Sequence, residues 1–97
     1  MRPPTHIDGA TVLEWAWSES PFGTVPFVDG SGAVSIHGLA ICRYGDAGGI
    51  YRFSCNRDWE TEQDGLYSSV AEAKSSLPTQ YREVAADWHL AELAVVT

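Results

Sequence analysis

Acidic side chains recur at alternate positions near the middle of the chain, at Asp58, Glu60, Glu62 and Asp64. On a β-strand, alternate side chains share one face and lie about 7 Å apart, a separation that some catalytic carboxylate pairs use. A row of acids on an exposed strand can also be a plain solvated face or a docking surface for a basic protein. We take these four acids, with Arg52 as their neighbour, as the candidate partner-binding residues, and catalysis or divalent-metal binding as the least favoured alternative.

Two cysteines and three histidines are the other residues that could carry chemistry. In the strand register favoured below, Cys42 and Cys55 lie roughly 13 Å apart, too far for a disulfide, so we expect two free thiols buried as small apolar residues. No CxxC or HxxxH spacing supplies four zinc ligands, and we expect no metal, no cofactor and no catalytic residue. A nucleophilic pair would need His37, expected on the opposite face, or His89, which the pattern does not place.

The charge balance narrows the choice of partner. The chain has 13 acidic and 6 basic residues, for a formal charge of -7, which repels phosphate backbones and anionic lipids. We therefore expect neither a nucleic acid nor a membrane as partner. No apolar segment follows the N-terminal Met1 to Pro4, and the longest uncharged run, Gly30 to Cys42, is too short and too Gly-rich to cross a bilayer. A cytoplasmic location with reduced cysteines is expected.

Two alternating segments, Ala33 to Tyr44 and Ile50 to Cys55, predict the central hairpin that positions the acids. The intervening Gly45 to Gly48 is typical of a hairpin loop. The favoured register sets small residues against large ones, which suits close packing. Its pairs are Cys42 with Tyr51, Ala40 with Phe53 and Gly38 with Cys55.

The next turn decides where the acids point. A three-residue turn of Asn56 to Asp58 would lead into a strand from Trp59 to Asp64, with Arg52 opposite Glu62. A two-residue turn would place acids on the aromatic face, where an unpaired buried carboxylate is costly. We therefore expect the longer turn, which points the acids of this strand outward.

The N-terminal part is expected to add a strand and an edge. Residues 1–9 are predicted to be an irregular lead-in, followed by a strand from Thr11 to Ser18 with Leu13, Trp15 and Trp17 on one side. The segment from Thr24 to Val28 contains Pro26, which suits an edge strand or a covering loop. Most of the four tryptophans should be buried, although Trp15 or Trp17 could form an exposed apolar patch for a partner.

Helical signals appear only near the C-terminus. Ser69 to Glu72 is a capping box, which predicts a helix from Val70 to about Ser76. Pro78 ends it, and Thr79 could cap a second helix with Tyr81, Val84, Ala85 and Trp88 on one face. Residues His89 to Thr97 fit an extension of that helix or a last strand. The predicted fold is one α+β domain over residues 1–97, an antiparallel meander of four to five strands followed by one or two C-terminal helices packed on one face.

The segments YRFSCNRDWE and SSVAEAK resemble a pattern of small uncharacterised bacterial proteins: an aromatic strand, S-C-N, W-E and S-x-x-E-A-K. The match covers Ile50 to Lys74, about a third of the chain. The resemblance implies a bacterial cytosolic protein and a strand-strand-helix order, and it carries over no functional residue.

These observations favour a small acidic, non-enzymatic protein that binds a basic protein partner, as an immunity protein or an inhibitor of a nuclease-like toxin would. The alternative is a structural or oligomerising module, monomer or homodimer, that uses the aromatic N-terminal strand and the Pro26 edge. A small hydrolase is the least favoured hypothesis.

Overall fold

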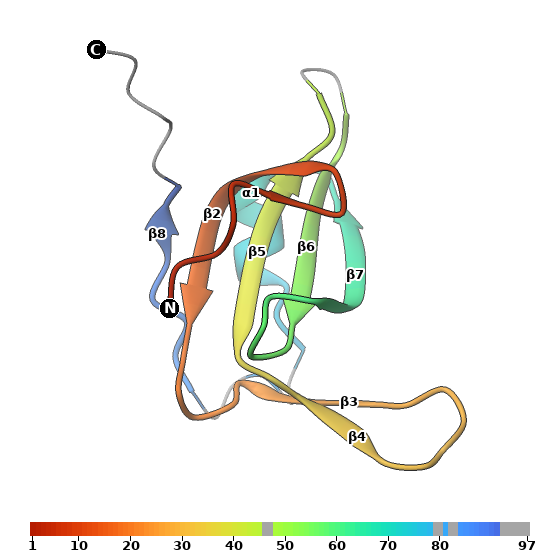
Figure 1. The fold of residues 1–97 in the computed structure, drawn as a ribbon. Helices are drawn as coiled ribbons and strands as arrows, with labels where there is room; N and C mark the ends of the chain where they lie inside the picture. Colours follow the sequence, from red (N-terminus) through yellow and green to blue (C-terminus); the bar gives the residue numbers. More distant parts are fainter. Residues whose placement is uncertain (46–47, 79–80, 82–83, 92–97) are drawn as a thin grey trace.

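Strands dominate the computed structural model of this chain, which describes residues 1–45, 48–78, 81 and 84–91 (Figure 1). The elements in chain order are β1 (His6–Ile7), β2 (Ala10–Trp17), β3 (Gly23–Pro26), β4 (Ala33–Ile36), β5 (Gly38–Arg43), β6 (Ile50–Cys55), β7 (Thr61–Tyr67), α1 (Val70–Ser75) and β8 (His89–Leu90). The α+β class holds in a coarse sense, because the fold is mostly antiparallel sheet with one short helix.

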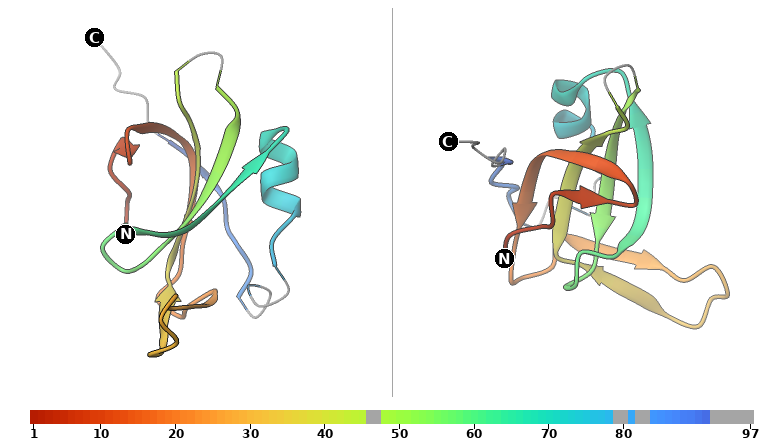
Figure 2. Two further views of the ribbon diagram at one scale, coloured as in Figure 1. Left: turned by 90° about the vertical axis from the view of Figure 1, so that its right-hand side faces the viewer. Right: turned by 45° about the horizontal axis from the view of Figure 1, so that its top comes forward.

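The main sheet has six strands in the order β1-β2-β5-β6-β7, and β8 also pairs with β2. It curls into a half-barrel, with α1 on one side and the N-terminal segment on the other (Figure 2). Strands β3 and β4 form a separate hairpin that projects from the sheet (Figure 1). The expected meander is therefore interrupted, and β5 pairs with β2 instead of with the strand before it. The lead-in is not wholly irregular, since His6–Ile7 pairs with the start of β2.

The central hairpin has the predicted register, with Cys42 opposite Tyr51 and Ala40 opposite Phe53. The expected single strand from Ala33 to Tyr44 is wrong, however, because it breaks at His37. The buried His37 ring bonds through Nδ1 to the Ser18 carbonyl at 2.9 Å, and its amide donates to the Cys55 carbonyl at 2.9 Å. These bonds fix the chain at the point where β4 turns away from the main sheet and β5 begins.

The predicted faces of β2 are wrong because the strand contains a bulge. The register to β5 shifts between Val12 and Glu14. An extra residue in one strand changes which side chains share a face. Val12 therefore packs in the same cluster as Trp15 and Trp17, although plain alternation places it opposite them.

The predicted register between β6 and β7 is wrong. Phe53 lies opposite Asp64 and Arg52 opposite Gly65, so the strand begins at Thr61 and the loop before it is longer than expected. The prediction assumed that acids on the aromatic side would be buried. In fact β7 is the last strand of the sheet, where Glu62 and Asp64 are exposed to solvent. The desolvation cost that guided the prediction does not apply at such an edge.

The first helix is confirmed, and the second is wrong for residues 84–88. Helix α1 begins at the predicted cap, where the Ser69 hydroxyl accepts a bond from the Glu72 amide at 3.1 Å. The Glu72 carboxylate bonds back to Ser68 rather than to Ser69. Residues 84–88 form no helix, and His89–Leu90 pairs with Glu14 and Trp15 of β2, an edge that β1 leaves uncovered. Thr79, the expected second cap, lies outside the described residues.

Both faces of the sheet are buried, so the core has two parts. On the side of the N-terminal segment a cluster gathers around the cysteines, with members Ile7, Ala10, Val12, Ala40, Cys42, Phe53, Cys55 and Trp59. On the side of α1 and the residues after it, a second cluster contains Ala16, Phe22, Val25, Ile36, Leu39 and Tyr81. Strand β5 supplies both clusters, which explains its nearly continuous apolar sequence.

Arg52 lies on the α1 side of β6 and is only 5% exposed, so its expected place beside the acids is wrong. Its Nη1 donates to the Ala73 carbonyl of α1 at 2.6 Å, and its guanidinium lies 4.6 Å from the centre of the Tyr67 ring. Burial lowers the pKa of Arg52 from its usual value. Arg52 thus attaches α1 to the sheet.

We predict that Arg52→Ala lowers the free energy of unfolding by about 2–4 kcal/mol, because it removes a bond from a charged group and the packing of the side-chain stem. Arg52→Met retains the stem and should lose clearly less. Urea unfolding followed by circular dichroism measures both values. Equal stability of Arg52→Ala and the unchanged protein would contradict this role.

Candidate functional site

The β6–β7 loop, residues 56–60, carries the first of the candidate acids and is closed by its own backbone. The Asn56 amide donates to the Glu60 carbonyl at 3.0 Å, and the Trp59 amide donates to the Asn56 carbonyl at 3.1 Å. Trp59 has a positive φ of 60°, a conformation that is strained for a bulky residue. Something outside the loop must therefore hold Trp59 in place.

That support comes from the aromatic cluster on the N-terminal side of the sheet. The Trp59 ring lies 6.3 Å from the Trp15 ring in an edge-on arrangement and 5.5 Å from the Trp17 ring, and the residue is 6% exposed. A Cβ atom at Gly38 would lie 2.5 Å from the Trp59 ring, so only glycine allows this approach. The aromatic contacts therefore fix the loop to the core.

The Asn56 side chain orders the carboxylates of Glu60 and Glu62 through hydrogen bonds. Its Oδ1 accepts the amides of Asp58 at 2.9 Å and Glu60 at 3.1 Å. Its Nδ2 donates to the Glu60 and Glu62 carboxylates, each at 3.0 Å. One neutral amide thus holds two like-charged groups close together without supplying a positive charge.

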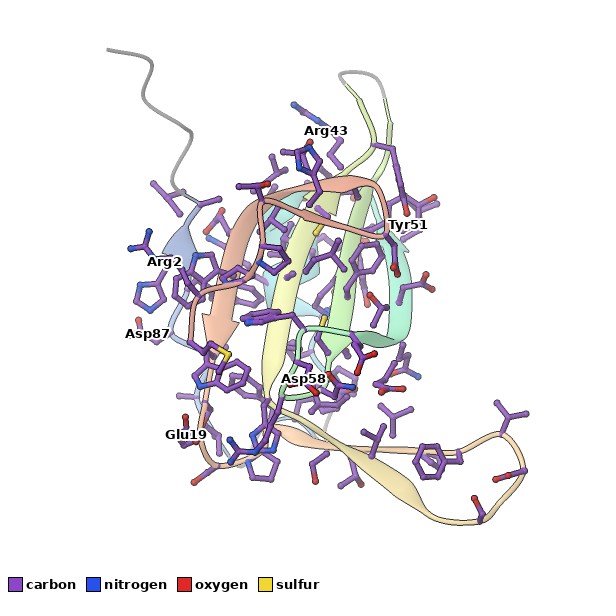
Figure 3. All side chains as sticks on the ribbon, viewed as in Figure 1. Arg2, Glu19, Arg43, Tyr51, Asp58 and Asp87 are labelled. Atoms are coloured by element: carbon purple, nitrogen blue, oxygen red, sulfur yellow. The ribbon has the colours of Figure 1, made fainter. Side chains whose placement is uncertain are left out.

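We call Asp58, Glu60, Glu62 and Asp64 the acidic surface; all four are exposed. In the described part of the chain, none of them has an ion-pair partner. The nearest arginine in sequence, Arg57, pairs instead with Glu19 at 3.0 Å on the β2–β3 connection. The hydrogen bond from Arg57, followed by that from Trp17, lowers the pKa of Glu19. Figure 3 shows Asp58 on the loop below β6 and Glu19 farther along the same end of the molecule. The acidic surface therefore presents uncompensated negative charge.

The thiols are free, as predicted, and both are fully buried in the aromatic cluster. Burial raises the pKa of Cys42 and of Cys55 to about 12. Both groups are then neutral thiols at physiological pH, and a thiol in that state is a poor nucleophile. His37 is held by the Ser18 carbonyl, and the His89 ring stacks on Trp15 at 4.6 Å.

No metal site or deep pocket accompanies the acids in the described residues. Among them, no group of three or more His, Cys, Asp and Glu side chains could hold a metal ion. A cavity of about 180 Å³ lies between the N-terminal segment and β2, lined by Arg2, Pro3, Pro4, Thr5, Val12, Trp15 and Ala91. It is smaller than the roughly 300–1,000 Å³ of typical ligand sites, and no acid of the acidic surface lines it.

Comparisons of the chain with protein-family models, with curated proteins and with solved structures found no match. None of the helices in the described ranges is both long and apolar enough to cross a membrane.

The structure thus keeps four of the five predicted partner-binding residues at the surface and removes Arg52 from it. Sequence analysis noted Asn56 only as a turn residue and missed its bonds to two carboxylates. It also missed that Trp59 anchors the loop. A tryptophan directly after a turn suggested an ordinary strand start, since large residues rarely adopt positive φ.

We predict that neither cysteine reacts with dithionitrobenzoate in the folded protein at about pH 8, and that both react after unfolding in urea. The absorbance of the released thiolate measures this. Rapid labelling of either cysteine before unfolding would contradict the burial described above.

The same burial makes stability fall at alkaline pH. Unfolded thiols lose their protons near pH 8.5, whereas the folded ones retain them up to about 12. Their contribution to the free energy of unfolding is complete below about pH 8.5 and decreases as the pH rises toward 12. Urea unfolding at increasing pH should show a smaller alkaline loss for Cys42→Ala and Cys55→Ala.

Proposed function

We propose that this protein is a non-enzymatic protein-binding protein of the inhibitor or immunity type, which docks its acidic surface on a basic protein such as a nuclease-like toxin. The observation that carries the proposal is the fixed geometry of uncompensated acids. Asn56 bonds to the carboxylates of Glu60 and Glu62, and Trp59 holds the loop on the aromatic cluster.

Preorganisation explains why such a geometry favours binding. Holding two carboxylates side by side raises their mutual repulsion, because like charges destabilise each other at short range. A partner that brings lysine or arginine to this place relieves the repulsion and pays little side-chain entropy, since the carboxylates are already ordered. A carboxylate row that only keeps the surface solvated would gain nothing from the Asn56 bonds.

The overall charge supports the same choice of partner. A formal charge of -7 on 97 residues attracts a positively charged protein from a distance and speeds its association. We also propose a cytoplasmic location, because a reducing compartment suits two unpaired cysteines.

A second candidate, an oligomerising module, is favoured by one observation. Strand β2 is paired on both edges, so the aromatic N-terminal strand offers no free edge for a second copy. The projecting β3–β4 hairpin, however, exposes Phe27 by 45% and Val28 fully at its tip. Adjacent exposed apolar side chains of this kind can contact another molecule.

The first proposal predicts that Glu60→Lys/Glu62→Lys abolishes capture of the basic partner from a lysate of the native host. Asp29→Lys/Asp87→Lys changes the net charge equally, and its two sites lie on the β3–β4 turn and beside β8, so it should retain capture. Capture by the unchanged protein should weaken as salt rises above about 0.1 M, because exposed charges are screened. Thermal unfolding of both double variants checks that they are folded.

Asn56→Ala tests the ordering apart from the charge. It retains every acid of the acidic surface and releases the carboxylates, so affinity for the captured partner should fall by about tenfold. Binding that is equal for Glu60→Lys/Glu62→Lys and for Asp29→Lys/Asp87→Lys would overturn the proposal.

The oligomer candidate predicts a concentration-dependent dimer in sedimentation velocity, reduced to monomer by Phe27→Ser/Val28→Ser because the apolar contact is lost. Thr24→Ala on the same hairpin serves as the control. A monomer at all concentrations would dismiss this candidate.

A further inference from the structure

Strand β7 ends the sheet, and no strand among the described residues pairs with its outer edge, which we call the open edge. It pairs with β6 on one side and is the last strand in the sheet order. Within the described residues, no backbone hydrogen bond to another segment reaches its outer edge. Helix α1 covers one face of the sheet rather than this edge (Figure 2). A row of unpaired N–H and C=O groups is a template for one more strand.

The hydrogen-bond pattern of the sheet identifies the residues that face outward. In antiparallel sheets, successive residues bond alternately to the strands on either side. The Ser18 amide donates to the His37 carbonyl at 2.9 Å, which sets the alternation across β2 and β5. When this alternation is continued through the registers of β5 with β6 and of β6 with β7, the backbone amides and carbonyls of Gln63, Gly65 and Tyr67 point toward β6. Asp64 and Leu66 therefore direct their amides and carbonyls to the open edge, whereas the register shift between Ser54 and Cys55 interrupts the alternation before it reaches Glu62.

Asp64 and Leu66 also share a face, so an added strand would meet their side chains, and Glu62 adds a second exposed carboxylate near the start of the strand. Glu62 and Asp64 belong to the acidic surface, and Leu66 is 64% exposed. Side chains directly opposite each other in an antiparallel pair lie about 5 Å apart and interact. Read from its N-terminus, an antiparallel occupant would best carry an apolar residue opposite Leu66 and, after one intervening position, a basic residue opposite Asp64. A second basic residue after one more position would lie toward the Glu62 carboxylate.

A second copy of the chain does not fit this edge. Antiparallel pairing of β7 with its own equivalent about Asp64 would bring Asp64 opposite Asp64, and any register would join two molecules that each carry a formal charge of -7. Strand β7 has neither lysine nor proline, and the edge-protecting features that it does carry are its two acids and the bulge at Glu62. The edge is thus closed to a copy by repulsion and remains open to a basic strand.

We infer that the basic partner contributes an extended segment, of the pattern apolar-x-basic-x-basic, that adds to the open edge of β7 as an antiparallel strand. The inference rests on the proposed function, because it describes how that same partner is held. The backbone bonds would supply affinity, and the acids would select the segment.

The test uses the synthetic peptide acetyl-TLTKTKT-amide and two N-methylated forms of equal charge. Methyl groups on the amides of the leucine and the first lysine remove the donors that would face β7, whereas methyl groups on the amides of the second and third threonines block donors that would face away. The first form should bind at least about tenfold more weakly than the second by calorimetry. In the unmodified complex, amide exchange should slow at Asp64 and Leu66.

Leu66→Pro supplies the matching change in the protein. It removes one outward donor without altering charge, at an edge position where proline is tolerated. Peptide affinity should fall about tenfold for Leu66→Pro and little for Leu66→Ala. Circular dichroism establishes that both variants are folded, and the two methylated peptides test the same bonds without any change to the protein.

The outcomes separate this inference from the proposed function. Equal affinity of the two methylated peptides, or no binding of the unmodified one, overturns strand addition. If the two methylated peptides bind with equal affinity and this binding is lost in the variant Glu62→Lys/Asp64→Lys, the proposed docking on the acidic surface is retained. If methylation matters and charge reversal does not, the acidic surface has no part and the edge acts alone. If the chain forms a dimer that the peptide dissociates, the occupant of the open edge is a second copy of the chain and not a basic segment.

Discussion

The contact between the Trp59 ring and the backbone of Gly38 is the constraint on which the candidate site depends. It brings the loop against the aromatic cluster, holds Trp59 at a φ of 60° and so fixes where Asn56 and its carboxylates stand. The Trp59 Nε1 finds no hydrogen-bond partner in the described residues. Leaving such a donor unpaired costs about 1–3 kcal/mol, so the apolar and aromatic contacts must outweigh that cost.

Two irregularities make room for this contact. The bulge in β2 turns Trp15 and Trp17 to the side where Trp59 packs, and the break at His37 lets β5 begin at the glycine on which the ring lies. A bulge also increases local twist, which suits the curl of the sheet. The bulge in β2 and the break at His37 thus position the candidate site, which regular strands alone would not do.

Sequence reasoning succeeded where local chemistry decides the structure. The β5–β6 register followed from size complementarity, and the Ser69 cap followed from the spacing of two residues. It failed where distant contacts decide. The β6–β7 register depends on β7 being an edge and on Trp59 leaving the strand, neither of which appears in the alternation. Residues 84–88 form no helix, and, of the two alternatives left open for the tail, residues 89–90 take the strand, because they gain backbone partners on β2 that outweigh their modest helix propensity. The four acids were identified from their residue type alone, whereas the bonds from Asn56 to two of their carboxylates were not predicted.

In the proposed strand addition, charge and hydrogen bonding would act on different aspects of recognition. Charge acts over about 10 Å and sets the rate and sign of an encounter, but it specifies neither direction nor register. Backbone groups act only at contact distance and specify both. On β7, Asp64 carries an acidic side chain and an outward backbone pair on the same residue, so a basic segment aligned by its charge on Asp64 would already be aligned for hydrogen bonding. A surface with only one of these properties would attract many basic proteins or pair with many strands; their coincidence is what would allow a chain of this size to choose one.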